Sequence, residues 1–258
     1  MKILLLFLLF AALVPAGLPA AAPAPPETGV PFRAGAIEID GRPDDPGWKA
    51  AAVLKLDRPP LGEPAAAPVP FTEIRLAYDE TTLYVAFVCR DDDIRPAAGP
   101  DGLLHTGDVA ELFIDGTGDR RRFFELQFNP AGLLRGTEHF FTGTELRLDA
   151  DGLWTEWDKI GERQDCILSG LRHAAGMLRD GEGRVCGWFV EAALPAEELL
   201  RRTGRGSFEA GKRLLANFVR YDYAAEKAGP DMVFWSATVS GRPHRSPGRF
   251  GTLLLLPR

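Results

Sequence analysis

Apolar and polar residues alternate along most of the chain, and this two-residue period leaves few folds open to it. In residues 72–79 the side chains of Ile74, Leu76 and Tyr78 share one face, because successive side chains of a β-strand point to opposite sides. Residues 83–91 are almost continuously apolar, as in a central strand covered on both faces. Similar strand-like segments are 108–115, 122–130, 187–195, 213–223 and 249–256. The pattern predicts roughly ten to thirteen strands in all.

Turn-forming residues between these segments indicate the fold class. The chain of 258 residues contains 28 glycines and 21 prolines, which favours a turn-rich β protein over a helical bundle. Residues 116–119 separate two alternating runs, as in a hairpin. Only residues 196–204 carry a helical pattern. The sequence therefore predicts an all-β protein, an antiparallel, jelly-roll-like β-sandwich with one or two short helices.

The N-terminus indicates where the protein is sent. Lys2 precedes an apolar run at residues 3–14, which is shorter than the about 20 residues that a membrane-spanning helix needs. Small residues follow this run, so residues 1–22 are interpreted as a secretory signal peptide. An uncleaved anchor helix is the alternative. We expect a secreted protein, periplasmic or extracellular, without stable membrane insertion after cleavage.

Two regions follow the predicted signal peptide. Residues 23–31 are rich in Ala and Pro and are expected to form an extended spacer. Residues 32–258 show no internal repeat and are predicted to form one domain. The formal net charge of −6 argues against nucleic acid as a partner, because proteins that bind a phosphate backbone usually present a basic face.

Three cysteines allow at most one disulfide bond within the chain. An odd count in an exported protein permits one disulfide and one free thiol. If a pair forms, we expect it between Cys166 and Cys186, across the irregular region 160–185. The alternative is that both remain buried thiols, together with Cys89.

Carboxylates and amides occupy the polar side of several predicted strands. They lie opposite the apolar core stripe and are Glu111, Glu125, Gln127, Asn129, Glu191 and Asn217. Polar side chains on the solvent face of a sheet are ordinary, so a solvated face is one interpretation. These strands, however, place the polar groups beside aromatic residues with almost no Lys. Such a face suits a sugar, whose hydroxyls donate and accept hydrogen bonds while its C–H patch packs on an aromatic plane.

Six segments, in the same order, resemble the carbohydrate-binding module family 9-like domains, members of the wider DOMON-like β-sandwich group. They are 39–48, 74–93, 108–132, 187–195, 211–223 and 234–251. The more specific motifs are the hairpin strand DVAELFID with its aromatic partner strand ending at Asn129-Pro130, and the Trp235-Ser236 segment with its Phe250-Gly251 ending. The resemblance implies a DOMON-like sandwich and a non-catalytic module that grips a sugar, often at a chain end, between two aromatic side chains.

The resemblance also implies roles for individual residues. Glu111 is similar in position to the family's ligand-contacting carboxylate, and Trp235 to one aromatic wall. Asp108, which opens the same motif, is a further candidate ligand-binding residue. His105 stands where the family commonly carries a Trp, and an imidazole offers less stacking area than an indole. We therefore expect a saccharide partner, mono-, oligo- or polysaccharide, bound by an altered site in a protein of carbohydrate catabolism or polysaccharide utilisation.

Acidic loops raise the question of calcium, which members of the family hold as a structural ion. The candidates are Asp91, Asp92 and Asp93 in one loop, and Asp115 with Asp119 in another. Oxygen-rich ligand sets of this kind suit Ca²⁺, but neither has the spacing of a defined calcium loop. Acidic turns without metal are the alternative, and no other cofactor is expected.

Two other classes of function stay open. A glycoside hydrolase would need two carboxyls roughly 5–5.5 Å or 6.5–9.5 Å apart, and Glu111, Glu125 and Glu191 offer pairs. Haem-mediated electron transfer, which some DOMON-like sandwiches perform, would need axial ligands such as Met with His. Met177 and Met232 and four histidines are available for this, without a CxxCH attachment motif.

Overall fold

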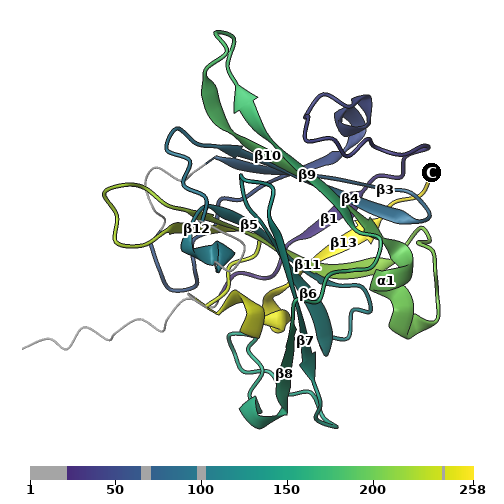
Figure 1. Ribbon diagram of the computed structural model, residues 1–258. Helices are drawn as coiled ribbons and strands as arrows, with labels where there is room; N and C mark the ends of the chain where they lie inside the picture. The colour runs from purple at the N-terminus through teal and green to yellow at the C-terminus, as the bar shows by residue number, and fades with distance from the viewer. Residues whose placement is uncertain (1–21, 65–70, 98–102, 240–241) are drawn as a thin grey trace, which may run out of the picture.

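The described strands form two stacked β-sheets (Figure 1). The computed structural model describes residues 22–64, 71–97, 103–239 and 242–258. The predicted signal peptide therefore lies outside the described residues, except for its last position. Within the described part of the chain, no helix is both long and apolar enough to cross a membrane.

The larger sheet contains eight strands, antiparallel except for its first pair. Its order is β1 (Glu27–Val30), β13 (Gly251–Leu255), β11 (Arg213–Asp222), β5 (Val109–Asp115), β6 (Arg122–Phe128), β7 (Leu134–Phe141) and β8 (Ile160–Gln164). The eighth strand, β12 (Asp231–Phe234), pairs with the second half of β11.

The smaller sheet contains five antiparallel strands. Its order is β2 (Ala52–Lys55), β3 (Thr72–Tyr78), β4 (Thr82–Arg90), β10 (Val185–Pro195) and β9 (Arg172–Arg179). The helix α1 (Ala196–Leu200) follows β10 and continues as the 3-10 turn η4 (Arg201–Thr203), as predicted for residues 196–204. The other 3-10 turns are η1 (Pro46–Ala50), η2 (Leu104–Thr106), η3 (Trp157–Lys159), η5 (Pro243–Arg245) and η6 (Pro247–Arg249).

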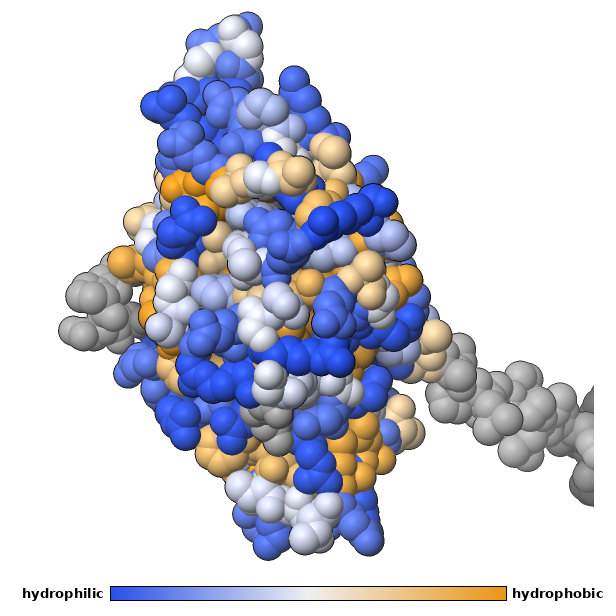
Figure 2. Space-filling view, turned by 90° about the vertical axis from the view of Figure 1, so that its right-hand side faces the viewer, coloured by the Kyte–Doolittle hydropathy of each residue, from blue (hydrophilic) through white to orange (hydrophobic). Residues whose placement is uncertain are grey.

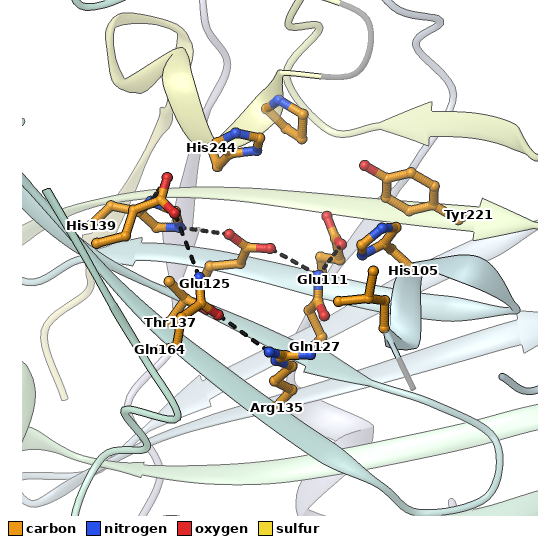
Figure 3. Close-up of a pocket in the computed structure, with 13 residues that line it drawn as sticks. His105, Glu111, Glu125, Gln127, Arg135, Thr137, His139, Gln164, Tyr221 and His244 are labelled. Carbon is orange, nitrogen blue, oxygen red and sulfur yellow. Dashed lines mark hydrogen bonds and ion pairs between the residues drawn. The ribbon is translucent and has the colours of Figure 1, made fainter. Parts of the chain in front are cut away.

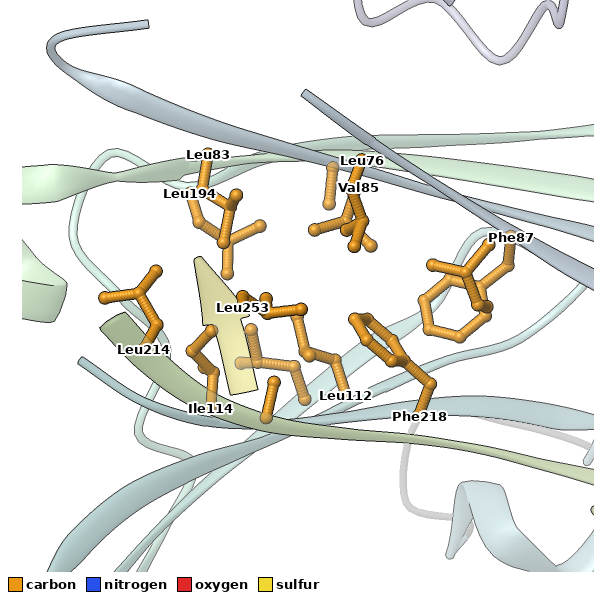
Figure 4. Close-up of a cluster of buried hydrophobic side chains, with 14 of the residues drawn as sticks. Leu76, Leu83, Val85, Phe87, Leu112, Ile114, Leu194, Leu214, Phe218 and Leu253 are labelled. Atoms are coloured by element: carbon orange, nitrogen blue, oxygen red, sulfur yellow. The ribbon is translucent and has the colours of Figure 1, made fainter. Parts of the chain in front are cut away.

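The predicted all-β sandwich is confirmed, and the alternating pattern explains how its two sheets pack. Ala110, Leu112 and Ile114 of β5 belong to the cluster between the sheets, whereas Phe113 belongs to a different cluster on the outer side of the larger sheet. In Figure 4, Leu76 and Val85 of the smaller sheet face side chains of the larger sheet such as Leu112. Full burial of each such side chain stabilises the fold by about 1.5–3 kcal/mol relative to exposure.

The first strand corrects the predicted spacer at residues 23–31. Residues 27–30 form β1, which runs parallel to β13 with Glu27 opposite Thr252. Val30 is fully buried in the core between the sheets. The Ala/Pro-rich composition concealed this strand, because only one of its four side chains packs into the core.

A second apolar cluster covers part of the outer face of the larger sheet. Phe113 and Phe123 project from β5 and β6 and pack with Trp154 and Phe250 from the segments that fold over them. The Phe123 and Phe250 rings meet edge to face, with their centroids 5.0 Å apart. The indole Nε1 of Trp154 donates to the carbonyl oxygen of Arg120, which anchors the covering segment. The neighbouring part of this outer face holds polar side chains.

The cysteines correct the predicted disulfide bond. All three are free thiols. Cys166 lies beside the larger sheet, where its backbone N–H donates to the carbonyl oxygen of Gly136. Cys186 lies in β10 of the smaller sheet, where its sulfur accepts a hydrogen bond from Arg90. The two residues are close in the sequence, but Cys166 lies beside the larger sheet and Cys186 in the smaller one.

Candidate ligand-binding site

A pocket lined mainly by polar residues opens on the outer face of the larger sheet, beside the second apolar cluster around Phe113 and Phe123. Its volume is about 320 Å³. The lining side chains come from β5, β6, β7, β8, β11 and the turns η2 and η5, and are Leu103, His105, Glu111, Glu125, Gln127, Arg135, Thr137, His139, Glu162, Gln164, Tyr221, Pro243 and His244. Four predicted site residues therefore meet in one place: His105, Glu111, Glu125 and Gln127.

Two carboxylates joined by one amide form the pocket floor. Glu111 of β5 lies opposite Gln127 of β6 in the sheet register. Gln127 Nε2 donates to Glu111 Oε1 and to Glu125 Oε1, at 2.8 Å in each case. The three side chains share one face because alternate residues of a strand point the same way. Neighbouring strands thus hold two acids close together around a neutral donor.

Glu111 is the least compensated group on this floor. Its residue is 1% exposed, and its Oε2 atom is buried without a hydrogen-bond partner. Burial and the nearby charge of Glu125 raise the pKa of Glu111 well above its usual range, against the lowering effect of the Gln127 hydrogen bond. A buried acceptor without a partner is costly, and this one lines a pocket.

His139 of β7 connects the floor with one side of the pocket. Its Nε2 atom lies 2.6 Å from Glu125 Oε2, and its Nδ1 atom lies 3.6 Å from Glu162 Oε1. Burial lowers the pKa of His139, but the two carboxylates outweigh burial and raise it overall. The pKa of Glu162 is lowered to about 2, chiefly by His139, and Arg245 also pairs with this carboxylate at 2.8 Å.

Rings from two turns and two strands surround the floor (Figure 3). His244 of η5 stacks on His139, with ring centroids 5.5 Å apart. On the other side lie His105 of η2 and Tyr221 of β11. The hydroxyl of Tyr223 donates to the carbonyl oxygen of His105 at 2.7 Å and holds that turn in place.

Trp235 is not a wall of this pocket, which corrects its predicted role. Its residue is 6% exposed and belongs to the core between the sheets, where its ring lies 5.6 Å from that of Phe218. Gly251 makes room for the indole, since a Cβ atom there would lie 2.5 Å from the Trp235 ring. The backbone N–H of Trp235 continues the pairing of β12 with β11, and this registration points the side chain inward.

Asn217 and Asn129, both predicted ligand-binding residues, hold the backbone instead. Asn217 exchanges hydrogen bonds with Ser236: its Nδ2 donates to the Ser236 carbonyl at 2.9 Å, and its Oδ1 accepts from the Ser236 N–H at 3.0 Å. Asn129 Oδ1 accepts from the N–H groups of Ala131 and Leu133 in the turn after β6. Both residues are fully buried and line no part of the pocket described above.

Glu191 lies on the outer face of the other sheet, so it too is removed from the predicted site. Its Oε1 accepts from the backbone N–H groups of Asp40 and Gly41, and its Oε2 from Trp48 Nε1 at 3.1 Å. The alternation of β10 correctly placed it opposite the core, but sequence pattern alone did not show which sheet β10 would join.

Asp108 is buried next to the pocket strand without lining the pocket. Its carboxylate accepts from the backbone N–H groups of Arg95 and Tyr223 and joins the two segments that flank β5. Burial raises the pKa of Asp108 to about 6, against the lowering effect of these two hydrogen bonds.

Four of the five predicted calcium ligands, Asp91, Asp93, Asp115 and Asp119, have protein partners. Asp115 accepts from the N–H groups of Thr117, Gly118 and Arg120 in the β5–β6 turn. In the described residues, one set of three acidic groups has its oxygens within 4.8 Å of one another, and it consists of Asp91, Asp108 and Asp222. The guanidinium of Arg220 binds Asp91 and Asp222 from within this set. Calcium stays an untested prediction.

Several pocket residues escaped the sequence interpretation. Thr137 and His139 lie on the same face of β7 because they are two residues apart. Glu138, between them, faces inward, so the inner face of this strand lacks the apolar residue that would have identified the alternation. Glu162 and Gln164 lie in β8, an edge strand whose sequence IGERQ contains a single large apolar residue, Ile160. A strand of this kind carries no periodic apolar signal.

The pocket on the outer face of the larger sheet, lined by carboxylates, amides and rings, is a candidate ligand-binding site. Residues 39–130 match a family model described as Carbohydrate family 9 binding domain-like, a span that includes Glu111, Glu125 and Gln127. The resemblance predicted from the sequence is thereby confirmed. No curated protein matches the sequence.

Solved structures share the fold over 90% of the chain. A candidate carbohydrate-binding protein from Bacteroides uniformis ATCC 8492 gives a TM-score of 0.65 at 18% identity, with 100% of that chain covered. A carbohydrate binding module family 9 from Caldicellulosiruptor kristjanssonii gives 0.61 at 16% identity in complex with cellotriose, with 94% covered. The complex with glucose gives 0.60 at 15% identity, with 96% covered. The chain thus has the fold of a family 9 carbohydrate-binding module.

Proposed function

We propose that this protein binds a saccharide, without catalysis, in the pocket on the larger sheet. The observation that carries the proposal is the floor of Glu111, Gln127 and Glu125, two fixed acceptors around an amide inside a pocket of the family 9-like fold. Sugar hydroxyls both donate and accept hydrogen bonds, so they match such a mixed floor. Glucose and cellotriose in the similar structures support this class of ligand.

The size of the pocket favours a short ligand or a chain end. Its volume of about 320 Å³ lies at the small end of the range of about 300–1,000 Å³ for small-molecule sites. The aromatic and imidazole rings that line it are those of Tyr221, His105, His139 and His244. We propose that one of these rings packs on the C–H face of the sugar, in place of the predicted Trp235. Stacking on an imidazole or phenol covers less area than stacking on an indole, which favours modest affinity.

Secretion and a part in polysaccharide utilisation belong to the same proposal. They rest on the predicted signal peptide at residues 1–22 and on the resemblance, and the test is cell fractionation of the natural host. Recovery of the mature chain in the cytoplasm would contradict export.

The arrangement of the acids favours binding over hydrolysis. Glu111 and Glu125 are close enough for a pair of catalytic carboxyls, since each lies 2.8 Å from the same Gln127 nitrogen. The raised pKa of Glu111 would also suit a general acid. However, the Gln127 amide occupies the space between the two carboxyls, where the scissile bond would have to lie. Prolonged incubation with oligosaccharides, followed by chromatography, should release no shorter product.

Haem binding stays the other alternative. Met177 lies on β9 of the smaller sheet and Met232 on β12 of the larger sheet, so the two described methionines come from different layers. Titration of the purified protein with haemin should leave the Soret band of free haemin unchanged. A shifted, saturable band would support the alternative.

Calorimetry with a panel of soluble glycans tests the binding proposal. We expect saturable binding of at least one saccharide. The Gln127→Leu variant should lose about tenfold or more in affinity, because the Gln127 Oε1 acceptor is removed and the two floor carboxylates lose the donor that holds them in place. The matched control is Glu182→Gln, an exposed acid on the β9–β10 hairpin. Absence of binding to every glycan, or unchanged binding in Gln127→Leu, would contradict the proposal.

A further inference from the structure

Among the described residues, the floor acid Glu111 has no ion-pair partner, although Arg135 also lines the pocket. Glu162 is paired with Arg245 and lies near His139, and Glu125 Oε2 is paired with His139. Glu111, in contrast, receives only the neutral amide of Gln127 on Oε1. Its Oε2 is buried, has no partner, and belongs to a side chain that lines the pocket. Of the acids that line the pocket, Glu111 is therefore the one that a cationic group of a ligand would stabilise most.

Repulsion between like charges adds to the cost of burying Glu111. Glu111 and Glu125 share a single donor, and two carboxylates at such a separation repel each other. A neutral sugar hydroxyl would satisfy one acceptor but leave the repulsion in place. A group with several N–H donors and a positive charge would satisfy the free oxygen and reduce the repulsion at once, because charge-assisted hydrogen bonds are stronger than neutral ones.

A metal ion fits this position less well. Metal sites need several ligand atoms close together, and in the part of the chain that the structure describes, the set of three acidic, His or Cys groups within reach of one ion is Asp91, Asp108 and Asp222, not the floor acids. The floor instead offers one carboxylate oxygen without a hydrogen-bond partner, on a side chain that lines the pocket. An ammonium group, which has three donors and no acceptor, can donate to that oxygen and keep its other donors for neighbouring acceptors.

We propose that the ligand is an amino sugar whose protonated amine binds Glu111. This inference rests on the proposed function and names the chemical class of the saccharide. The amine donates to Glu111 Oε2, and the remaining hydroxyls meet Gln127 and the polar side chains of β7 and β8. The net charge of −6 on the chain also favours the approach of a cationic ligand.

Three disaccharides with the same linkage test the inference on the unmodified mature protein. The probes are the β-1,4-linked glucosamine disaccharide, its N-acetylated form and cellobiose, which differ only at the C2 substituent. Calorimetry near neutral pH should show the amine form binding roughly tenfold or more tightly than the other two, the expected effect of one charge-assisted hydrogen bond. Added salt should reduce this preference.

The Glu111→Gln variant locates the preference. An amide of the same shape cannot neutralise an ammonium, so the variant should bind the amine form and cellobiose with similar affinity. Glu182→Gln should keep the wild-type preference. Equal or tighter binding of cellobiose by the wild-type protein would overturn the inference and leave the proposed function standing. Binding of none of the three would overturn the inference, while the broader glycan panel decides the proposed function separately.

Discussion

The burial of Glu111 is costly for the folded protein. The residue is 1% exposed, and one of its oxygens has no hydrogen-bond partner in the protein. Burial and the charge of Glu125 raise its pKa, so the ionised form is disfavoured by the folded protein. Residues with this character are typical of functional positions.

Replacement of Glu111 by Gln should therefore stabilise the unliganded protein at neutral pH. The folded pKa is raised above the unfolded value, so wild-type stability is greatest below the unfolded pKa and falls as the pH rises through the folded pKa. The gain in the variant should be about 1–3 kcal/mol near pH 7 and vanish below about pH 4. Urea unfolding of both proteins across this range measures it, and a less stable variant at pH 7 would contradict the argument.

Replacement of His139 should destabilise the protein, in contrast to replacement of Glu111. The pKa of His139 is raised, so the stability that its charge contributes is fully present below its unfolded pKa and is lost as the pH rises through the folded value. On the acid side, the pKa of Glu162 is lowered to about 2, so this contribution fades as the pH falls below the unfolded value of Glu162. His139→Gln should cost about 1–3 kcal/mol near pH 6 and less near pH 9. Thermal unfolding at both pH values tests this, and an equal cost would argue against an ionised His139.

At the scale of elements, Arg220 of β11 joins the two sheets at one end of the core. Its side chain is fully buried, and its Nη2 donates to Asp91, which follows β4, at 2.8 Å. Its guanidinium also lies 5.4 Å from the centre of the Trp188 ring on β10. A strand of one layer is thus fastened to two strands of the other.

Loss of this buried cation should be costly. Arg220→Met should lower the free energy of unfolding by about 3–5 kcal/mol, because Asp91 and Asp222 would be left without their cation. Arg213→Met is the matched control on the same strand, since Arg213 pairs with Glu27 where both side chains are about half exposed. An exposed pair of this kind contributes less than about 1 kcal/mol. Chemical denaturation of both variants measures the difference, and equal losses would refute the role given to Arg220.

The sequence predicted elements well wherever one face of a strand is apolar. The alternation in β5 and β6 correctly separated Leu112 and Leu126, which face the core, from Glu111 and Gln127, which face the pocket. It could not predict which sheet a strand joins, so Glu191 was grouped with acids of the opposite layer. Nor could it show that Trp235 is buried, because inward or outward direction after β12 depends on pairing with β11.

At the scale of the whole molecule, the N-terminal strand completes the sandwich. β1 covers the edge of β13, and the Thr252 N–H donates to the carbonyl oxygen of Pro26. The exposed large apolar side chains are few and scattered in sequence. On the face shown in Figure 2, small hydrophobic areas are likewise separated by hydrophilic side chains. Without β1, the edge of β13 would become a further open strand edge.

Removal of residues up to 31 should expose that edge. Compared with a chain that starts at residue 23, a chain that starts at residue 32 should lose about 5 °C or more in Tm, because burial of Val30 and the β1–β13 hydrogen bonds are lost. It should also self-associate, since an unpaired strand edge is a template for pairing. Calorimetry and light scattering test both effects. If both chains were equally stable and monomeric, residues 23–31 would be the simple spacer that composition suggests.

The pocket divides into parts with separate origins. Its charged base belongs to paired strands, whereas His105 and His244 are carried by the turns η2 and η5. Substitutions in these turns can therefore change the walls of the pocket while the hydrogen-bonded floor of Glu111, Gln127 and Glu125 stays intact. A protein lineage, or a designer, could exchange one ring for another there and retune selectivity in small steps without rebuilding the scaffold.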